Sequence, residues 1–244
     1  QRKTFTNFIC SEFKQYGIVN YQDIDDGDYG HDKLCIQIES LHKVSRASYD
    51  VVVIDEIETV LSQFSSSTMH NVRRCWDTLI MCINLCSHCI VADAFILQRS
   101  IDFIKEMSLV NNGAITMIHN TQPYLEDRKA IQISQDTFDD RLIDDLKKGL
   151  RIVYVSASRT DLLELKYKVM SQCPEKNIKI YDRDSDKSDL LNVNDSWATC
   201  DLVGYTPVIQ TGVSYMGTPF DICYANLKSS NLARDAQQML MRCR

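Results

Sequence analysis

Short apolar runs alternate with longer helical patterns along this chain, and this alternation constrains the fold more than any other feature of the sequence. The runs are rich in Val, Ile and Tyr, and several are apolar throughout, as strands buried on both faces are. They are CIQI (35–38), VVVI (51–54), CIVA (89–92), AITMI (114–118), AIQI (130–133), RIVYV (151–155), IKIY and DICYA (221–225). The alternation predicts an α/β protein with mostly parallel sheets.

Four helices are predicted between these runs, because apolar residues recur there at three-to-four spacing. They cover residues 68–88, 97–108, 137–149 and 159–172. Asp136 and Ser158 open the last two patterns and have side chains suited to capping a helix N-terminus.

A domain border is predicted within HNTQPYLEDRK (119–129), which is polar, contains Pro123 and follows an apolar run. A chain of 244 residues is long enough for two modest domains. We therefore predict two α/β domains of similar size, residues 1–122 and 123–244.

Composition excludes several classes of protein. With a net charge of −6, the chain as a whole does not attract nucleic acid electrostatically. Any contact with nucleic acid must therefore be local or made by other parts of the protein. Ten cysteines at irregular spacing, with no signal peptide, favour a reducing intracellular setting over a disulfide framework. No apolar run reaches about 18 residues, so no membrane-spanning helix is expected.

The stretch VVVIDEIETV (51–60) places the acids Asp55, Glu56 and Glu58 directly after an apolar run. Ligands of parallel sheets gather beyond the carboxyl ends of the strands. Magnesium takes one or two carboxylates together with phosphate oxygens. Asp55 would hold the hydrated ion and Glu56 would orient or deprotonate a water, which suits phosphoryl transfer. The alternative is a strand that ends in an acidic surface turn.

Two other segments carry candidate site residues. IVADAF (90–95) places Asp93 between two alanines at the end of another predicted strand, where it can lie close to the first carboxylate. QRKTFTNF (1–8) gathers Arg2, Lys3 and two hydroxyls, a composition suited to phosphate contacts, or simply a polar start of the chain.

The segment CINLCSHC (82–89) contains four potential metal ligands. Zinc sites usually join two separated ligand pairs, and here the surroundings are apolar. Because cysteine also packs as a small hydrophobic residue, we interpret this segment as helix core.

Taken in order, several segments resemble the motifs of superfamily 2 helicases, and more narrowly those of the viral origin-of-replication-binding helicases of herpesvirus type. The segments are RKTFTNF, CIQIESLHKV (35–44), VVVIDEIETVLSQFSS (51–66) at motif II, VADAF (91–95) at motif III, LRIVYVSAS (150–158) at motif IV, GYTPVIQTGVSY (204–215) at motif V and QMLMRCR (238–244) at motif VI. The resemblance spans nearly the whole chain.

The resemblance implies two tandem RecA-like domains, the first truncated at its N-terminus, with ATP and Mg²⁺ in the cleft between them. The chain would then be the motor core of an ATP-dependent DNA helicase in viral DNA replication or origin unwinding. Implied partners are DNA and replication proteins such as a primase or a single-strand-binding protein. The implied location is the host nucleus or a cytoplasmic viral factory, away from membranes.

Site residues follow from the same resemblance. Asp55 and Glu56 would form the magnesium and water-activating pair, and Asp93 would couple hydrolysis to movement. The residues expected to face the γ-phosphate are Gln238, Arg242 and Arg244. Those expected to contact DNA are Arg2, Lys3, Thr4, Thr206, Thr211 and Gly212, with Gln210 and Ser214 bordering the same region.

The sequence departs from the family pattern in three places. It contains no G-x-x-x-x-G-K-[ST] loop, which in this family should precede Gln1. We therefore expect an excerpt of a longer protein that alone binds ATP poorly. Motif VI reads R-C-R, one residue shorter than the common R-x-x-R spacing, and motif III lacks Ser-Ala-Thr.

Two other functions fit the same residues. One is a non-catalytic, helicase-like DNA-binding or scaffold module, suggested by the missing phosphate-binding loop. The other is a metal-dependent nuclease or phosphatase that uses Asp55, Glu58 and Asp93.

Overall fold

The computed structural model describes all residues except 1, 47, 122–127, 210–212, 229–232 and 243–244. It divides into two compact units: an N-terminal unit, Ile9–Glu126, and a C-terminal unit, Asp127–Arg244 together with Gln1–Phe8. The predicted border between residues 122 and 123 lies outside the described residues. Both units are α/β, and all strand pairs formed by the described residues are parallel, which confirms the predicted mostly parallel sheets.

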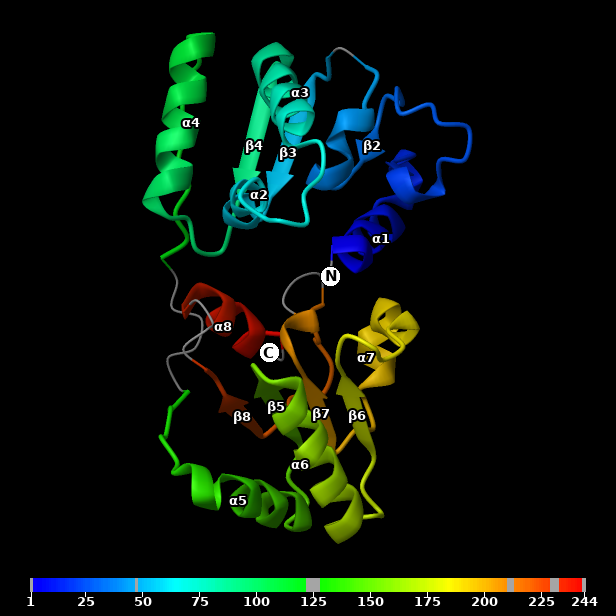
Figure 1. Cartoon of the computed structure of the whole chain (residues 1–244), viewed down its shortest axis with the longest axis vertical. Coiled ribbons are helices and arrows are strands. Elements are labelled where there is room, and N and C mark those ends of the chain that lie inside the picture. The colour runs from blue at the N-terminus through cyan, green and yellow to red at the C-terminus, as the bar shows by residue number, and fades with distance from the viewer. Residues whose placement is uncertain (1, 47, 122–127, 210–212, 229–232, 243–244) are drawn as a thin grey trace. The chain divides into compact units, whose positions relative to one another are not determined.

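The N-terminal unit is built around the parallel pair β3–β4 (Figure 1). Its strands are β1 (Val19–Asn20), β2 (Leu34–Cys35), β3 (Val51–Asp55) and β4 (His88–Ala92). Its helices are α1 (Arg2–Glu12), α2 (Ile57–Gln63), α3 (Val72–Leu85), α4 (Gln98–Asn111) and the 3-10 turns η1 (Lys14–Tyr16), η2 (Tyr21–Asp23) and η3 (Ile38–Lys43). The structure divides α1 between the two units after Phe8.

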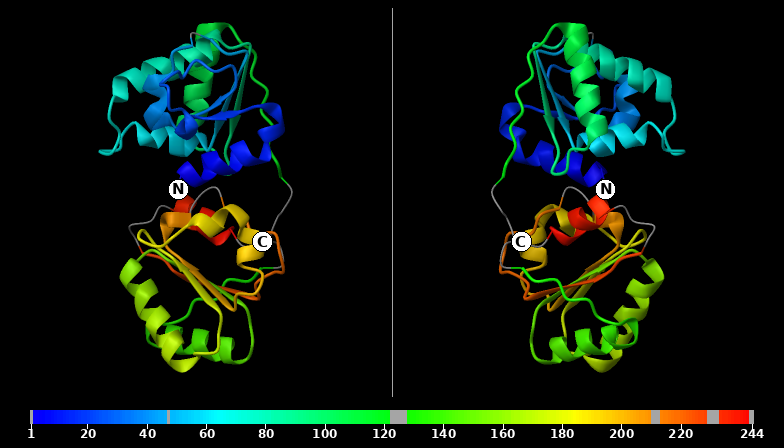
Figure 2. Two further views of the ribbon diagram at one scale, coloured as in Figure 1. Left: turned by 90° about the vertical axis from the view of Figure 1, so that its right-hand side faces the viewer. Right: turned by 90° about the vertical axis from the view of Figure 1, so that its left-hand side faces the viewer.

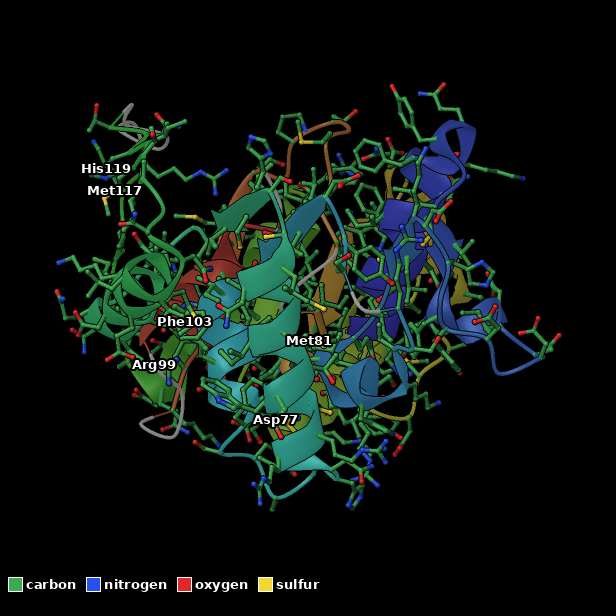
Figure 3. The ribbon with its side chains drawn as sticks, turned by 90° about the horizontal axis from the view of Figure 1, so that it is seen from above. Asp77, Met81, Arg99, Phe103, Met117 and His119 are labelled. Carbon is green, nitrogen blue, oxygen red and sulfur yellow. The ribbon has the colours of Figure 1, made fainter. Side chains whose placement is uncertain are left out.

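One face of the β3–β4 pair carries the core of this unit. Ile54 packs with Ile57 and Leu61 of α2, with Leu79 of α3 and with Phe103 of α4. Figure 3 shows Phe103 and Arg99 on α4, Asp77 and Met81 on α3, and Met117 and His119 on the segment that follows α4.

The opposite face of this pair is exposed, which corrects the expectation that VVVI is buried on both faces. The exposed fractions of Val51, Val53 and Ile90 are 50%, 65% and 54%. The predicted strand AITMI (114–118) is irregular, and Ile118 is 92% exposed. AIQI (130–133) also forms no strand. A strand needs a hydrogen-bonded neighbour, and the described residues offer these two segments none.

The C-terminal unit is a four-stranded parallel sheet in the order β6-β7-β5-β8. The strands are β5 (Ile152–Ser156), β6 (Ile178–Tyr181), β7 (Leu202–Tyr205) and β8 (Ile222–Asn226). The helices are α5 (Gln135–Lys147), α6 (Arg159–Gln172), α7 (Val193–Ser196), α8 (Ala233–Leu240) and the 3-10 turns η4 (Ser188–Asn192) and η5 (Pro207–Ile209). Figure 2 shows α5 and α6 on one face of the sheet and α7 and α8 on the other.

Both faces of this sheet are covered, so β5 is buried at all five positions, as its apolar run predicts. Ile152 and Tyr154 face the α5–α6 layer, while Val153 and Val155 face the layer that contains Trp197.

Strand β7 was not among the predicted runs, because LVGY is short and is interrupted by Gly204. The glycine is required where it stands. A Cβ at this position would lie 2.6 Å from Cδ1 of Ile180 and 2.9 Å from Cδ1 of Leu162, so glycine allows α6 to approach the sheet closely.

The helix starts follow the predicted caps only in part. Ser158 caps α6 as expected, because its side chain accepts a hydrogen bond from the amide of Asp161. The N-cap of α5 is Ser134, and Asp136 lies in the first turn instead. None of the helices within the described ranges has the length and apolar character needed to cross a membrane.

Arg151 ties two segments of the C-terminal unit, residues 197–200 and 218–220, to the start of β5. Its guanidinium donates to the carbonyl oxygens of Trp197 at 2.8 Å, Cys200 at 3.1 Å and Thr218 at 2.6 Å. It also lies 4.4 Å from the centre of the Phe220 ring. This one side chain therefore satisfies carbonyl groups that the sheet does not pair.

We expect Arg151→Met to destabilise the C-terminal unit by about 1–3 kcal/mol, because three carbonyl groups lose their donor. The measurement is urea unfolding followed by Trp197 fluorescence in a Trp76→Phe background. Arg183→Met is the control, since that side chain is 94% exposed and should cost no more than about 0.5 kcal/mol. Equal losses in the two variants would contradict the structural role of Arg151.

Candidate functional site

The acidic strand end lies where β3 turns into α2. The register pairs Asp55 with Ala92, so Asp93 follows directly on the neighbouring strand, as parallel pairing requires. Asp55 is exposed, and its Oδ1 accepts a hydrogen bond from the amide of Glu56 at 3.0 Å. The two predicted strand ends therefore share one edge of the sheet.

Glu56 occupies the left-handed region of backbone conformation, with φ 54° and ψ 51°. A non-glycine residue pays roughly 1–2 kcal/mol for this conformation, which persists only where surrounding contacts impose it. The turn ends the strand sharply and starts α2 at the next residue.

Asp93 binds the first turn of α2. Its Oδ2 accepts from the amide of Glu58 at 3.0 Å, and its Oδ1 accepts from the amide of Phe95 at 2.8 Å. The first amides of a helix have no partner inside the helix, so this carboxylate acts as an external cap of α2.

Glu58, on α2, in turn binds the start of α4. Its side chain is 2% exposed, its Oε1 accepts from the amide of Leu97 at 2.7 Å, and its Oε2 accepts from Nη2 of Arg99 at 2.8 Å. The same nitrogen of Arg99 donates to the backbone oxygen of Glu58 at 2.9 Å. We call Asp93, Glu58, Arg99 and these bonded amides the interlock.

Burial raises the pKa of Glu58, but the Ser100 hydroxyl, the Leu97 amide and the Arg99 guanidinium together outweigh burial and hold this pKa below its usual value. The Ser100 hydroxyl is buried beside the carboxylate without the geometry of a regular hydrogen bond. Glu58 is therefore a buried anion held by donors, and its role, which the sequence left unassigned, is to join α2 to α4.

Asp55 fits the binding mode in which magnesium takes a single carboxylate together with phosphate oxygens, because its carboxylate is exposed at the strand end. Within the described ranges, no three His, Cys, Asp or Glu side chains are grouped to hold a metal ion. The carboxylates of Glu58 and Asp93 instead bind amides and the Arg99 guanidinium within the interlock.

The C-terminal unit holds the described residues of motifs V and VI. The backbone oxygen of Arg242 accepts from the amide of Tyr215 at 2.9 Å, and its Nη1 donates to the backbone oxygen of Val213 at 3.4 Å. Motifs V and VI are thus bonded to each other. Thr206 and Gln238 are buried, with exposed fractions of 8% and 2%.

Several predicted site residues cannot be placed. Gln210, Thr211, Gly212 and Arg244 lie outside the described residues. Arg2, Lys3 and Thr4 lie in α1, but their side chains are outside the description. Ser214 is exposed.

The interpretation of residues 82–89 as helix core is confirmed only for the start of this segment. Cys82 packs in α3 with an exposed fraction of 5%. Cys86 follows the end of α3 and donates to the backbone oxygen of Ile83 at 3.2 Å, while Cys89 is exposed in β4. The nine described cysteines are free thiols.

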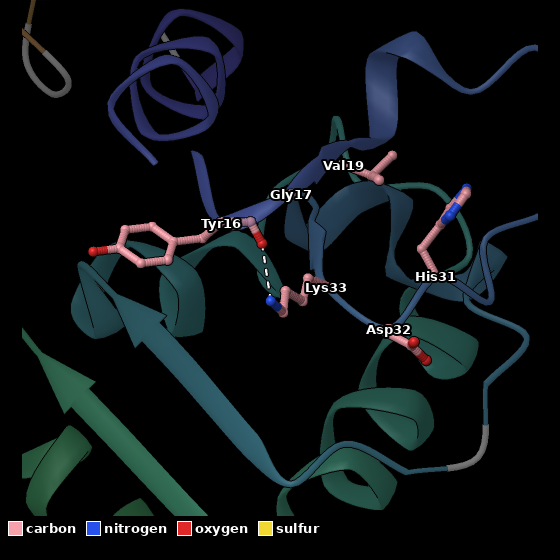
Figure 4. A pocket seen from close by; sticks show the side chains of 6 residues that line it. All are labelled: Tyr16, Gly17, Val19, His31, Asp32 and Lys33. Carbon is pink, nitrogen blue, oxygen red and sulfur yellow. Dashed lines mark hydrogen bonds between the residues drawn. The ribbon is translucent and has the colours of Figure 1, made fainter. Parts of the chain in front are cut away.

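A separate open pocket of about 350 Å³ is lined by Tyr16, Gly17, Val19, His31, Asp32 and Lys33 (Figure 4). Nζ of Lys33 donates to the backbone oxygen of Tyr16 at 2.9 Å. The residues that line this pocket include none of the predicted site residues.

The fold has a known structural counterpart. The structure titled "S. cerevisiae Dbp5 L327V bound to RNA and ADP BeF3" matches with a TM-score of 0.58 at 12% identity, over 92% of this chain and 59% of the other. The likeness shows the fold, which is the RecA-like α/β fold.

The sequence comparison identifies the family. The family described as "Origin of replication binding protein" matches residues 1–122, and the chain belongs to this family. Two similar proteins come from Acanthamoeba polyphaga mimivirus. "Putative replication origin-binding protein" is 31% identical over 98% of this chain and 31% of its own length, and "Uncharacterized putative helicase R8" is 29% identical over 98% and 24%. The chain thus spans 24% to 31% of the length of these relatives.

We expect Asp93→Ala to free the amides of Glu58 and Phe95. Losing a cap costs about 1–2 kcal/mol, so hydrogen exchange at these amides should accelerate by about 5- to 30-fold. Asp102→Ala on α4 is the control, because the Asp102 carboxylate accepts a hydrogen bond from the exposed side chain of Gln98 at 2.7 Å and caps no helix start within the described residues. Unchanged exchange in Asp93→Ala would show that the cap is not formed in solution.

Proposed function

We propose that this chain is part of the motor of an ATP-dependent DNA helicase that acts in viral DNA replication or origin unwinding. Membership of the origin-binding family, the names of the two viral relatives and the RecA-like fold support this proposal. The observation that carries it is the acidic strand end, where Asp55 is exposed and Glu56 stands at a forced turn beside Asp93.

In this proposal, Asp55 is the protein ligand of magnesium, together with phosphate oxygens of ATP. Glu56 orients or deprotonates the attacking water, which is the remaining task of a protein in phosphoryl transfer. Gln238, Arg242 and Arg244 are assigned to the γ-phosphate, where an arginine neutralises developing charge. The sequence lacks G-x-x-x-x-G-K-[ST], so the proposal concerns the complete protein.

The DNA contacts are proposed for Arg2, Lys3, Thr4, Thr206, Thr211 and Gly212. Cations and hydroxyl groups bind phosphates without reading sequence, so these residues would follow the DNA backbone. Other replication proteins, including a primase or a single-strand-binding protein, are proposed as partners. Because the net charge of the chain is −6, DNA binding requires local contacts such as those proposed for Arg2 and Lys3.

In the complete protein, Glu56→Gln should bind ATP as wild type does and lose about 10²- to 10⁴-fold in kcat, because the carboxylate that accepts the proton is gone. The measurements are nucleotide binding and ATP hydrolysis, with and without single-stranded DNA. Glu106→Gln, an exposed position on α4, is the control and should keep wild-type turnover. Wild-type turnover in Glu56→Gln would refute the assignment.

The same assay decides on a second candidate, a helicase-like scaffold without catalysis, which the missing phosphate-binding loop favours. A complete wild-type protein that binds DNA but neither binds nor hydrolyses ATP would establish the scaffold. DNA cleavage with metal and without ATP would instead establish the nuclease.

Arg2→Ala and Lys3→Ala should each weaken binding to single-stranded DNA in the same way for all sequences. Each lost phosphate contact should lower the slope of log affinity against log salt by about 0.7. Titrations at several salt concentrations measure this slope. Lys105→Ala, on α4, is the matched loss of a cation and should leave the slope unchanged. An unchanged slope in Arg2→Ala and Lys3→Ala would remove these residues from the DNA site.

A further inference from the structure

We propose that Arg99 and Glu58 are positioning residues that hold Glu56 in its left-handed turn and thereby aim the Glu56 carboxylate at the reacting water. This inference rests on the proposed function, since it concerns the same hydrolysis. It begins with the conformation of Glu56, which is unfavourable for a residue with a side chain and must be held by its surroundings.

The backbone of Glu56 is held on both sides. Before it, the carboxylate of Asp55 accepts from the Glu56 amide at 3.0 Å. After it, the Glu56 oxygen accepts from the amides of Thr59 at 2.8 Å and Val60 at 3.0 Å, as the first carbonyl of α2. The orientation of Glu56 therefore depends on the place of the first turn of α2.

The interlock fixes the place of that turn. The Glu58 amide binds Asp93, and the Glu58 side chain binds the Leu97 amide and Arg99. The start of α2 and the loop from β4 to α4 thus bind each other at both ends of that loop. A shift of α2 against the loop would break both sets of bonds.

Arg99 belongs to α4, and this helix is itself anchored in the core of the unit. Phe103, one turn further along α4, is buried in the core beside Ile57. Arg99 stands on the same side of α4, yet its side chain is 52% exposed. It can therefore be changed without opening a core cavity, while Glu58 would keep a buried charge with fewer donors.

Loss of the Arg99 contacts should affect the rate of ATP hydrolysis more than the binding of ATP. The interlock contacts are made at Glu58, two residues after Glu56. Asp55 precedes Glu56 and belongs to β3, and its carboxylate accepts from the Glu56 amide at 3.0 Å. A displacement of about 1 Å at a catalytic group can cost about 10²-fold in rate. Loss of Arg99 should therefore lower kcat and leave the KM for ATP nearly unchanged.

The test is steady-state ATP hydrolysis by the complete protein in the presence of single-stranded DNA. Arg99→Met should lower kcat by about 10- to 100-fold and leave KM unchanged. Arg99→Lys, which restores the charge but reaches fewer acceptors, should recover part of kcat. Lys148→Met is the matched control, because Lys148 is 66% exposed and pairs with Asp145, a carboxylate that is only 11% exposed, on α5. It should keep wild-type kcat.

A second variant tests whether Arg99 acts through Glu58. Glu58→Gln keeps the size and an acceptor for Leu97 but removes the charge. If the pair acts as one unit, Glu58→Gln with Arg99→Met should lose no more kcat than the worse single variant. Hydrogen exchange at Thr59 and Val60 should accelerate in Arg99→Met and remain unchanged in Lys148→Met.

The outcomes separate this inference from the function on which it rests. An inactive wild-type protein would overturn the proposed helicase function and this role together. An active wild type, with Arg99→Met and Lys148→Met equal in kcat, would overturn only the positioning role. Additive losses in the double variant, or a raised KM with unchanged kcat, would do the same.

Discussion

The parallel register of β3 and β4 is the constraint on which the candidate site depends. Because Asp55 stands opposite Ala92, the turns that follow the two strands lie side by side, and each supplies an acid to the helix start of the other. Parallel strands bring their carboxyl ends to one edge, which is why residues far apart in sequence meet there. A slip of one residue would place Asp93 on the other face and undo both contacts.

The apolar runs of the two units differ in how completely they are buried. In the C-terminal unit, helices cover both faces, and every residue of β5 is buried. In the N-terminal unit, Val51, Val53 and Ile90 leave one face of a two-stranded sheet open to solvent, and Ile118 is exposed beyond α4. Burying such side chains is favourable by about 25 cal/mol per Å². Their sequence pattern therefore specifies more burial than the described residues provide, and a two-stranded sheet alone is marginally stable.

Much of the fold follows from local sequence, while the support of the site does not. The runs VVVI, CIVA and RIVYV form strands, and α6 begins and ends where its spacing predicts, since periodicity and capping are local. AITMI (114–118) fails because a strand also needs a neighbour. Asp55 and Glu56 can be identified as candidate site residues from the sequence, because they are adjacent and directly follow an apolar run. The bond from Arg99 to Glu58 joins residues 41 positions apart, and no spacing rule reports it.

The three acids of D-E-I-E stand in three different environments. Asp55 is exposed and has the solvent access that a hydrated cation requires. Glu56 is half-buried on a left-handed turn, so its direction depends on backbone contacts that other residues make. Glu58 is a buried anion whose oxygens bind the Leu97 amide and Arg99. A nuclease that needs all three carboxylates at one ion would have to break the interlock, whereas the proposed phosphoryl transfer through Asp55 and Glu56 would leave the interlock intact.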